Sequence, residues 1–422
     1  MSVRNKSQAT LIGLEKFFDG FSFKQYLFLV FFLALIFRLL IILFLSNFER
    51  VYGMENEVIA LNMLAGKGYS YAFIVNMMPS ALVGPVYTFF LYLHFFLFGK
   101  NYLLVELSQA VLGAFSAILT ALIARRLISQ AVGIISGLLF AVYPIYAYWC
   151  ALPHQLILDI FLIELSIYLA MVSVEKKKFG YHLLAGLVMG LSALSKSFYL
   201  SFVPIYIIWL WQKPRTKSLI YIATIWLLSA VIIILPWAIR NYKVFSELIP
   251  LTTNGGANLW YGNNPFASGA LYTEDGKPML SMIPDDLMGK IHLAKTEAEK
   301  DQLLYQAGIT WIKQNPIKFV KLIPYRLRAI WWFDPEMASN FPLLREIVYI
   351  LLLLFSLPGI WLTRKNWQKF SVFYLLFLWT SFFYSFTVGQ ARFRYLLEFS
   401  FLIFAGVFLS WLWVKFRERL YY

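Results

Sequence analysis

The sequence is poor in charged residues and has a single cysteine, and both shortages restrict what the protein can be. Only 14% of its 422 residues are charged and 60% are hydrophobic, whereas soluble domains carry about 25% charged residues. Such a chain has too little polar surface to remain in water, which excludes an ordinary soluble domain. The one cysteine, Cys150, excludes an internal disulfide and is expected to be a small apolar residue at a helix end.

Long apolar runs recur along the chain, and most of them are about 20 residues long, the length that a helix needs to cross a bilayer. Inside lipid every backbone group must be paired within the protein, so a spanning segment is a helix or part of a closed barrel. The runs do not alternate polar with apolar residues, which excludes a barrel. The candidate spans are 25–46, 82–98, 103–124, 131–150, 155–174, 181–195, 198–212, 218–238, 342–362, 370–388 and 396–415.

Basic residues predict the orientation, because Lys and Arg gather in cytoplasmic loops. This rule accounts for the net charge of +15 without nucleic-acid binding, which we do not expect. The basic clusters are the tail before Lys24, Arg125-Arg126, 176–178, 213–217, 364–369 and 415–419. All of them become cytoplasmic if 82–98 does not cross. That run is short, contains Gly84, Pro85 and His94, and resembles an interfacial segment.

The predicted fold is therefore an all-α polytopic membrane protein with about ten transmembrane helices. Juxtamembrane helices are expected in the first external loop, and a small lid in the second. The predicted regions are a cytoplasmic tail (1–24), an N-terminal transmembrane catalytic module (25–238) with its first external loop (47–102), an external loop region (239–340) and C-terminal transmembrane helices (341–422).

The lid region contains both turn and helix signals. Asn254-Gly255-Gly256 and Gly262-Asn263-Asn264-Pro265 predict turns. Residues 296–314 predict a helix that ends at Asn315-Pro316, and 317–333 predict a basic amphipathic helix at the membrane surface.

Carboxylates and cations converge on the external side of this topology. The candidate residues are Glu55, Glu57, Asp159, Arg38, Lys196, Arg240, Arg392 and Arg394. Arginine forks bind phosphate oxygens, a carboxylate can deprotonate an acceptor, and cations stabilise a departing phosphate. A lipid-linked phosphate substrate would fit this set. The alternatives are solvated loop acids, an Arg38 that snorkels outward, and interface anchors at Arg392 and Arg394.

Several stretches resemble one family. Residues 55–70, which end in Gly66-Lys67-Gly68-Tyr69-Ser70, are similar to the acidic juxtamembrane helix of polyprenyl-phosphate-sugar-dependent glycosyltransferases of the C superfamily. That family includes protein O-mannosyltransferases and aminoarabinose transferases, as in bacterial glycosyltransferase family 39. Residues 79–99 resemble its second juxtamembrane element, and Pro-Trp-Ala-Ile-Arg-Asn (236–241) with 252–265 resembles the start of its main external loop. Ala391-Arg392-Phe393-Arg394 resembles the Arg-aromatic-Arg turn before a late helix.

The resemblance implies an inverting hexosyl- or pentosyltransferase with a polyprenyl-phosphate sugar donor. The acceptor would be a lipid, a glycan or a protein. The expected location is a bacterial inner membrane among its lipids, with a periplasmic active site that serves cell-envelope glycans.

The resemblance also implies roles for individual residues. Glu55 is favoured as the base, or as a metal-linked orienter of the acceptor, with Glu57 and Asp159 as further carboxylates. His154-Gln155 stand where the family often has its second acid, so a divalent cation (Mg²⁺ or Mn²⁺) stays open. The implied phosphate contacts are Lys196, Arg392, Arg394, Arg240 and Arg38, although Arg240 could be structural.

Two other kinds of protein remain as alternatives. A polysaccharide polymerase or ligase would also use external arginines, but it leaves the acidic helix of the first loop unexplained. A transporter of lipid-linked sugars would predict internal repeats and polar groups at mid-membrane, and the sequence shows no convincing repeat.

Overall fold

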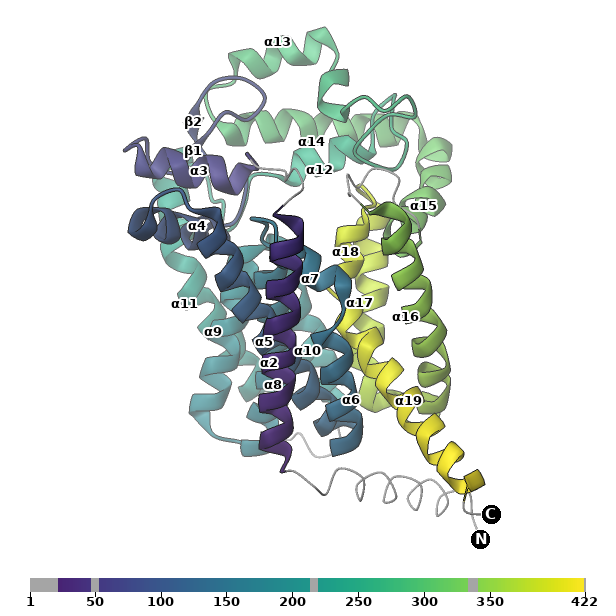
Figure 1. The fold of residues 1–422 in the computed structure, drawn as a ribbon. Coiled ribbons are helices and arrows are strands. Elements are labelled where there is room, and N and C mark those ends of the chain that lie inside the picture. The colour runs from purple at the N-terminus through teal and green to yellow at the C-terminus, as the bar shows by residue number, and fades with distance from the viewer. Residues whose placement is uncertain (1–21, 47–52, 213–218, 333–340, 421–422) are drawn as a thin grey trace.

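The computed structural model describes residues 22–46, 53–212, 219–332 and 341–420, and this part of the chain is almost entirely helical. A bundle of long helices carries a layer of shorter helices at one end (Figure 1). The described strands are β1 (Ser70–Tyr71) and β2 (Met78–Pro79), which pair antiparallel with Ser70 opposite Pro79. The all-α prediction is confirmed.

Six stretches of the described chain are long and apolar enough to cross a membrane. They are α2 (Phe23–Leu45), α5 (Tyr102–Leu127), α8 (Leu156–Lys176), α11 (Leu219–Phe245), the stretch Pro342–Ser385, and α19 (Glu398–Leu420). The stretch Pro342–Ser385 contains two helices, α16 (Pro342–Thr363) and α17 (Trp367–Ser385), joined by the 3₁₀ turn η4 (Arg364–Asn366). The protein is therefore a polytopic membrane protein.

The predicted span 131–150 is not one continuous helix. It is formed by α6 (Gln130–Ala141) and α7 (Pro144–Cys150), which meet at 51°. Pro144 has no N–H to continue the ladder of α6, which explains a break at this point. Two further apolar segments are short: α9 (Phe179–Ser195), and η2 (Ser197–Ser201) with α10 (Phe202–Trp211).

The run 82–98 forms a 14-residue helix, α4 (Pro85–Phe98), which falls short of the length required of a span. At a rise of 1.5 Å per residue it measures roughly 21 Å, against about 30 Å of hydrocarbon. Its N-cap, Gly84, touches α9: a Cβ there would lie 2.0 Å from the carbonyl oxygen of Leu194. Glycine therefore lets α4 approach the outer end of α9.

Helix α8 is the most enclosed of the long helices, since 72% of its apolar window is buried, against 22% for α2. Phe28 and Leu40 of α2 are exposed, as expected for a lipid-facing helix. The first turn of α8 is consequently a place where a polar side chain is shielded from lipid, and this turn carries Asp159.

The lid is a layer of helices at the end of the bundle opposite the C-terminus, on the same side as α3 (Glu55–Leu64) and α4 (Figure 1). It contains α12 (Gly255–Gly262), η3 (Met279–Met282), α13 (Asp285–Leu293), α14 (Glu297–Gln314) and α15 (Pro316–Trp331). The predicted break at Asn315-Pro316 is confirmed, and α15 takes the place of the amphipathic helix expected over 317–333.

Helix α12 was not predicted, since its sequence indicated only turns. The Asp301 carboxylate of α14 accepts the backbone N–H groups of Gly256 and Ala257, each at 2.9 Å. These bonds satisfy donors that a helix leaves open in its first turn. A long-range contact therefore makes a helix where the local residues favour turns.

Candidate active site

Asp159 and Lys196 meet at the outer end of the bundle. Asp159 is 1% exposed and accepts a hydrogen bond from the Ser195 hydroxyl at 2.5 Å. Lys196 follows Ser195 and lies between α9 and η2, outside both helices. Its ammonium interacts electrostatically with Asp159 and lies 4.6 Å from the centre of the Phe393 ring. The structure thus brings together two of the residues that the sequence singled out.

Arg392 completes this cluster from the short helix α18 (Ala391–Tyr395). It is half-buried, it interacts electrostatically with Lys196, and its Nε has no hydrogen-bond partner among the described residues. Burial and the neighbouring Arg392 lower the pKa of Lys196. Two cations beside one carboxylate leave a positive surplus that would stabilise a bound anion.

His154 takes no proton at this site. It lies in the turn between α7 and α8, where its Nδ1 accepts the N–H of Leu156 at 3.1 Å. Burial, Arg392 and Lys196 lower the pKa of His154 to about 3, so the ring is neutral. The residue in the place of the family's second acid is therefore a structural cap.

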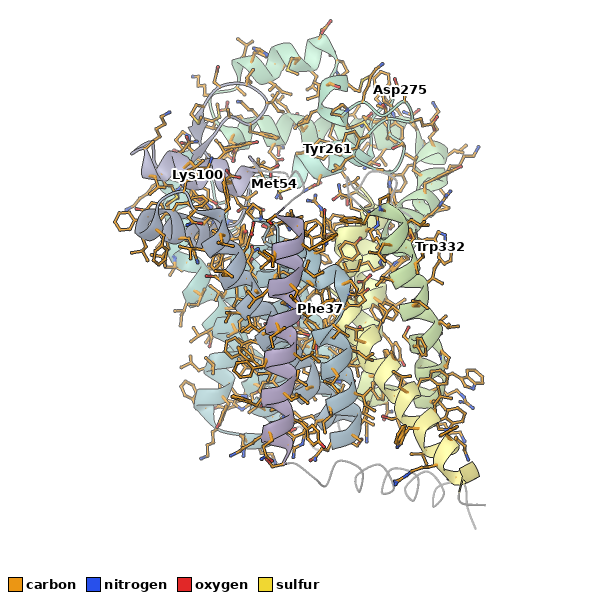
Figure 2. All side chains as sticks on the ribbon, viewed as in Figure 1. Phe37, Met54, Lys100, Tyr261, Asp275 and Trp332 are labelled. Atoms are coloured by element: carbon orange, nitrogen blue, oxygen red, sulfur yellow. The ribbon has the colours of Figure 1, made fainter. Side chains whose placement is uncertain are left out.

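Glu55 is exposed in the first turn of α3. It interacts electrostatically with Tyr261 of α12, and Tyr261 in turn interacts with Arg392. Figure 2 labels Tyr261 and Met54, the N-cap of α3, at the level where the lid layer meets the bundle. Tyr261, which the sequence did not single out, links the acidic and basic halves of the site.

Glu57, the second carboxylate predicted on α3, is buried and engaged with neighbouring residues. Its Oε2 accepts the N–H of Gly53 at 2.7 Å, while its Oε1 accepts the Tyr102 hydroxyl and lies 3.4 Å from the Lys100 ammonium. Only 2% of the residue is exposed. These contacts fasten α3 to the start of α5 and occupy both carboxylate oxygens.

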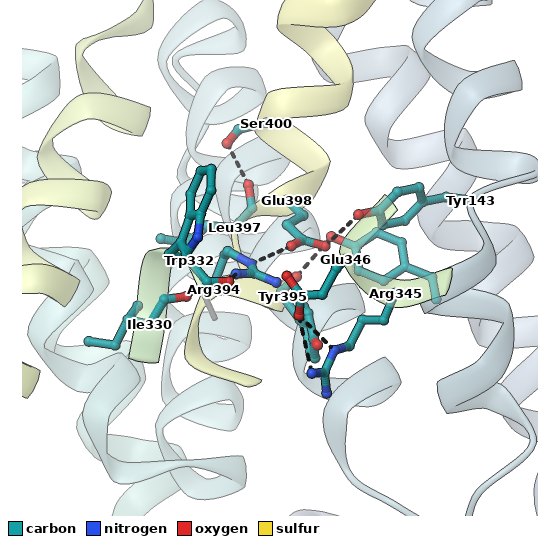
Figure 3. Close-up of polar contacts among 11 residues, drawn as sticks. Tyr143, Ile330, Trp332, Arg345, Glu346, Arg394, Tyr395, Leu397, Glu398 and Ser400 are labelled. Atoms are coloured by element: carbon teal, nitrogen blue, oxygen red, sulfur yellow. Dashed lines mark hydrogen bonds and ion pairs between the residues drawn. The ribbon is translucent and has the colours of Figure 1, made fainter. Parts of the chain in front are cut away.

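Arg394, which was predicted to contact phosphate, makes its described hydrogen bonds within the protein. It is fully buried, and its Nε donates to the Glu398 carboxylate at 2.7 Å. One terminal nitrogen donates to the carbonyls of Ile330 (3.2 Å) and Trp332 (3.1 Å), as Figure 3 shows. Glu398 accepts a further bond from Tyr143 at 2.7 Å. Arg394 thus joins the end of α15 to α19 and to the α6–α7 break.

Arg38 does not snorkel, because it is fully buried inside the bundle. Its Nη1 donates to the carbonyls of Ala34 and Ala141, each at 3.0 Å. Ala141 is the last residue of α6, so Arg38 ties α2 to the α6–α7 break. This position suits a structural residue rather than the expected phosphate contact.

Arg240 has both structural and site character. It donates to the carbonyls of Ser80 (2.6 Å) and Tyr69 (3.0 Å), and its guanidinium lies 4.9 Å from the centre of the Trp237 ring. The segment that it grips is held from the lid as well: Glu297 accepts the Ser80 hydroxyl at 2.6 Å. A capping pattern marks the start of α14, but nothing local in the sequence indicates this contact of Glu297.

An apolar groove of about 660 Å³ runs between α4, α9 and α11, with Arg240 among its lining residues. Its walls include Phe89, Leu194 and Ile233. Leu194 of its wall is two residues before Lys196 in the chain. Its apolar lining is suited to a hydrocarbon chain, and Arg240 to an anionic group at its end.

The three candidate carboxylates, Glu55, Glu57 and Asp159, do not gather into one cluster of potential metal ligands. In the part of the chain that the structure describes, no three His, Cys, Asp or Glu side chains gather as potential ligands. Glu57, one of the three candidate carboxylates, is held by Lys100 and Tyr102. A Mg²⁺ ion is usually held by one or two carboxylates together with waters and phosphate oxygens, so a divalent cation stays an open prediction of the resemblance.

Comparison with known proteins supports the family resemblance. The family described as dolichyl-phosphate-mannose-protein mannosyltransferase matches residues 79–239, which include Asp159 and Lys196. No curated protein sequence gives a significant match.

The oligosaccharyltransferase of Archaeoglobus fulgidus, in its apo form, has a TM-score of 0.57 at 13% identity; the alignment covers 94% of this chain and 51% of that one. The same enzyme tethered to an acceptor peptide with the NVT sequon gives 0.58 at 12% identity, with 95% and 50% covered. ArnT from Cupriavidus metallidurans bound to undecaprenyl phosphate gives 0.39 at 12%, with 92% and 77% covered.

The chain spans about half the length of the archaeal enzyme, and at this identity the likeness establishes the fold alone. The family match covers residues 79–239, and over that part of the chain it supports the resemblance to the glycosyltransferase C superfamily.

Proposed function

We propose that the protein is a membrane glycosyltransferase that moves a sugar from a polyprenyl-phosphate donor to an acceptor on the external face. The observation that carries this proposal is the pair of cations, Lys196 and Arg392, beside the buried Asp159, together with an apolar groove whose wall includes Leu194, two residues before Lys196. A lipid phosphate needs both an apolar channel for its chain and cations for its head. This arrangement offers the two together.

In this reaction the donor chain lies in the groove between α4, α9 and α11. Arg240 borders the groove, and Lys196 follows two residues after Leu194 in its wall. The donor's phosphate would lie where the apolar lining of the groove ends, and there it would contact these cations and Arg392. Asp159 interacts with Lys196 and is itself held by Ser195, so it orients the ammonium.

Glu55 is the proposed base. Its carboxylate takes the proton from an acceptor hydroxyl or amine, whose oxygen or nitrogen attacks the anomeric carbon opposite the phosphate. The bond between that carbon and the phosphate oxygen breaks, and the phosphate leaves with the bonding electrons. Lys196 and Arg392 stabilise its increasing charge. Attack opposite the leaving group inverts the configuration at the anomeric carbon.

We further propose that ten segments cross the membrane: α2, α5, the bent pair α6–α7, α8, α9, η2 with α10, α11, α16, α17 and α19. In Figure 1, α2 begins and α19 ends at the end of the bundle away from the lid. That end is cytoplasmic in this proposal. The lid then faces the periplasm of a bacterial inner membrane.

This topology can be tested with a cysteine at Ser129, the N-cap of α6. Because Cys150 is fully buried, the unmodified chain should react little. We expect Ser129→Cys to resist an impermeant maleimide in intact cells and to react after permeabilisation. Asp286→Cys, on the exposed face of α13, should react in both. Labelling of Ser129→Cys in intact cells would instead make α4 a true span.

The function itself is tested by mass spectrometry of surface lipids, glycans and proteins from cells with and without the chain. We expect one sugar increment to disappear with the chain and to return with the wild type. Glycans that lose whole repeat units would instead indicate a polymerase or ligase. Unchanged glycans, lipids and proteins would contradict enzymatic transfer.

A further inference from the structure

A second cavity, of about 650 Å³, lies in the lid between the segment 268–276 and α15. Tyr272 and Tyr325 contribute to its wall and are 37% and 59% exposed. Glu274 and Arg328, both exposed, add a carboxylate and a guanidinium to it. Figure 2 places the labelled Asp275, which belongs to this segment, at the outer part of the lid, far from the end of the bundle where α19 ends.

The cavity is held in shape by the segment's own hydrogen bonds. The Ser268 hydroxyl donates to the Tyr272 carbonyl at 2.5 Å, and the N–H of Thr273 donates to the Lys277 carbonyl at 2.9 Å. Gly269 has a φ of +96°, and a Cβ there would lie 3.2 Å from the Tyr325 Cβ. Glycine thus allows the backbone to lie against α15 and leaves the tyrosine ring at the cavity wall.

A hydrogen bond joins the cavity's segment to the chain that leads to Arg392. The N–H of Gly389 donates to the Gly269 carbonyl at 3.0 Å. Gly389 is three residues before Arg392 in the chain. The segment that forms the cavity therefore rests on the segment that leads into α18.

The lining restricts the class of ligand. Its volume falls within the range of about 300–1,000 Å³ that small-molecule sites occupy. Exposed tyrosine rings offer flat apolar faces with a polar end, which suit the CH face of a pyranose. Arg328 can donate to hydroxyl groups and Glu274 can accept from them. Because the two charges are opposite, the wall favours a neutral polyhydroxyl ligand over an anion or a lipid chain.

We propose that this lid cavity binds a neutral saccharide, namely the glycan part of the acceptor. This inference rests on the proposed glycosyl transfer, which it extends by naming the acceptor class. In this proposal the apolar groove binds the lipid chain of the donor. The lid cavity binds the acceptor glycan, on a segment that is hydrogen-bonded to Gly389, three residues before Arg392.

Saturation-transfer NMR on the full chain in nanodiscs tests the proposal without any donor. The probes are three neutral trisaccharides: maltotriose, mannotriose and N,N′,N″-triacetylchitotriose. We expect saturation transfer to at least one of them, and affinity at least tenfold weaker in Tyr272→Ala/Tyr325→Ala. Tyr305→Ala, which removes an exposed tyrosine of α14 outside the cavity, is the matched control and should bind as the wild type does.

Three results would overturn the saccharide assignment. The first is a wild-type saturation-transfer signal that does not exceed that of the double variant for any of the three trisaccharides. The second is a trisaccharide affinity that is the same in the double variant as in the wild type. The third is preferential binding of a neutral tripeptide, Ala-Tyr-Ala, that the double variant loses, which would assign the cavity to peptides.

Kinetics separate this inference from the proposed function. The double variant should raise the KM for a glycan acceptor and leave kcat unchanged, because the cavity contacts no reacting atom. If the wild type transfers sugar and the double variant has the same KM, the cavity proposal is wrong and the transferase proposal stands. If surface glycans, lipids and proteins are unchanged in cells without the chain but trisaccharide binding follows the expected pattern, the transferase proposal is wrong and the saccharide-binding cavity stands.

Discussion

Replacing Glu55 with glutamine should lower the rate of sugar transfer by about 10²- to 10⁴-fold and leave donor affinity unchanged. The amide has the shape of the carboxylate but cannot take a proton from the acceptor. Glu55 is exposed in the first turn of α3, so its replacement removes only a favourable charge at a helix N-terminus, worth about 0.3–1 kcal/mol. The fold should therefore persist. Transfer is measured in membranes with labelled donor, and affinity by titration with undecaprenyl phosphate.

Two variants serve as controls for the Glu55 experiment. Asp286→Asn removes an exposed acid in the first turn of α13 and should transfer normally. Glu57→Gln should instead lower thermal stability, because it weakens the contacts with Lys100 and Tyr102. Wild-type transfer by Glu55→Gln would disprove the assigned role and make Asp159 the next carboxylate to test.

Replacing Arg392 with alanine should weaken the binding of undecaprenyl phosphate by about 10- to 150-fold, since a hydrogen bond to a charged group contributes about 1.5–3 kcal/mol. Arg392 interacts with Lys196, and its Nε has no partner among the described residues, so its donors can serve a ligand. Arg392→Lys should recover part of the affinity, because lysine keeps the charge but loses the planar fork. Titration at fixed ionic strength measures the effect.

Other arginines provide the comparison for Arg392. Arg364 is an exposed arginine of η4 that stacks on Trp361 of α16. The Arg364→Ala variant should bind undecaprenyl phosphate as the wild type does. Arg394→Ala should lower the free energy of unfolding by about 3–5 kcal/mol, because it leaves Glu398 buried without its cation. Equal affinities of wild type and Arg392→Ala would remove Arg392 from the donor site.

The sequence predicts that the protein lies in a lipid bilayer and where many of its helices begin and end, because both follow from local properties of the chain. Apolar runs of spanning length indicate a bilayer wherever they fold. The break at Asn315-Pro316 is equally local, since proline suits a helix start and not an interior. Pro144 is a similar local indication of the break between α6 and α7. It was overlooked because the apolar run 131–150 has the length of one continuous span.

Features that depend on distant residues could not be predicted in this way. Helix α12 forms because Asp301, about 45 residues later in the chain, satisfies its first N–H groups. Glu297 holds Ser80 from a different region of the sequence. The apolar groove needs α4, α9 and α11 side by side, and the lid cavity needs 268–276 against α15.

Composition and apolar runs alone indicate a helical membrane protein, and charge placement gives the candidate residues of its site. Close neighbours are distinguished by the contacts of the folded chain: Glu55 and Glu57 are two positions apart on α3, and Arg392 and Arg394 are two apart on α18. Residues two apart on a helix point in nearly opposite directions, about 200° around the axis. Glu55 and Arg392 are consequently the more exposed members of the two pairs and the ones that we propose for the site, whereas Glu57 is buried among Lys100 and Tyr102, and Arg394 against Glu398.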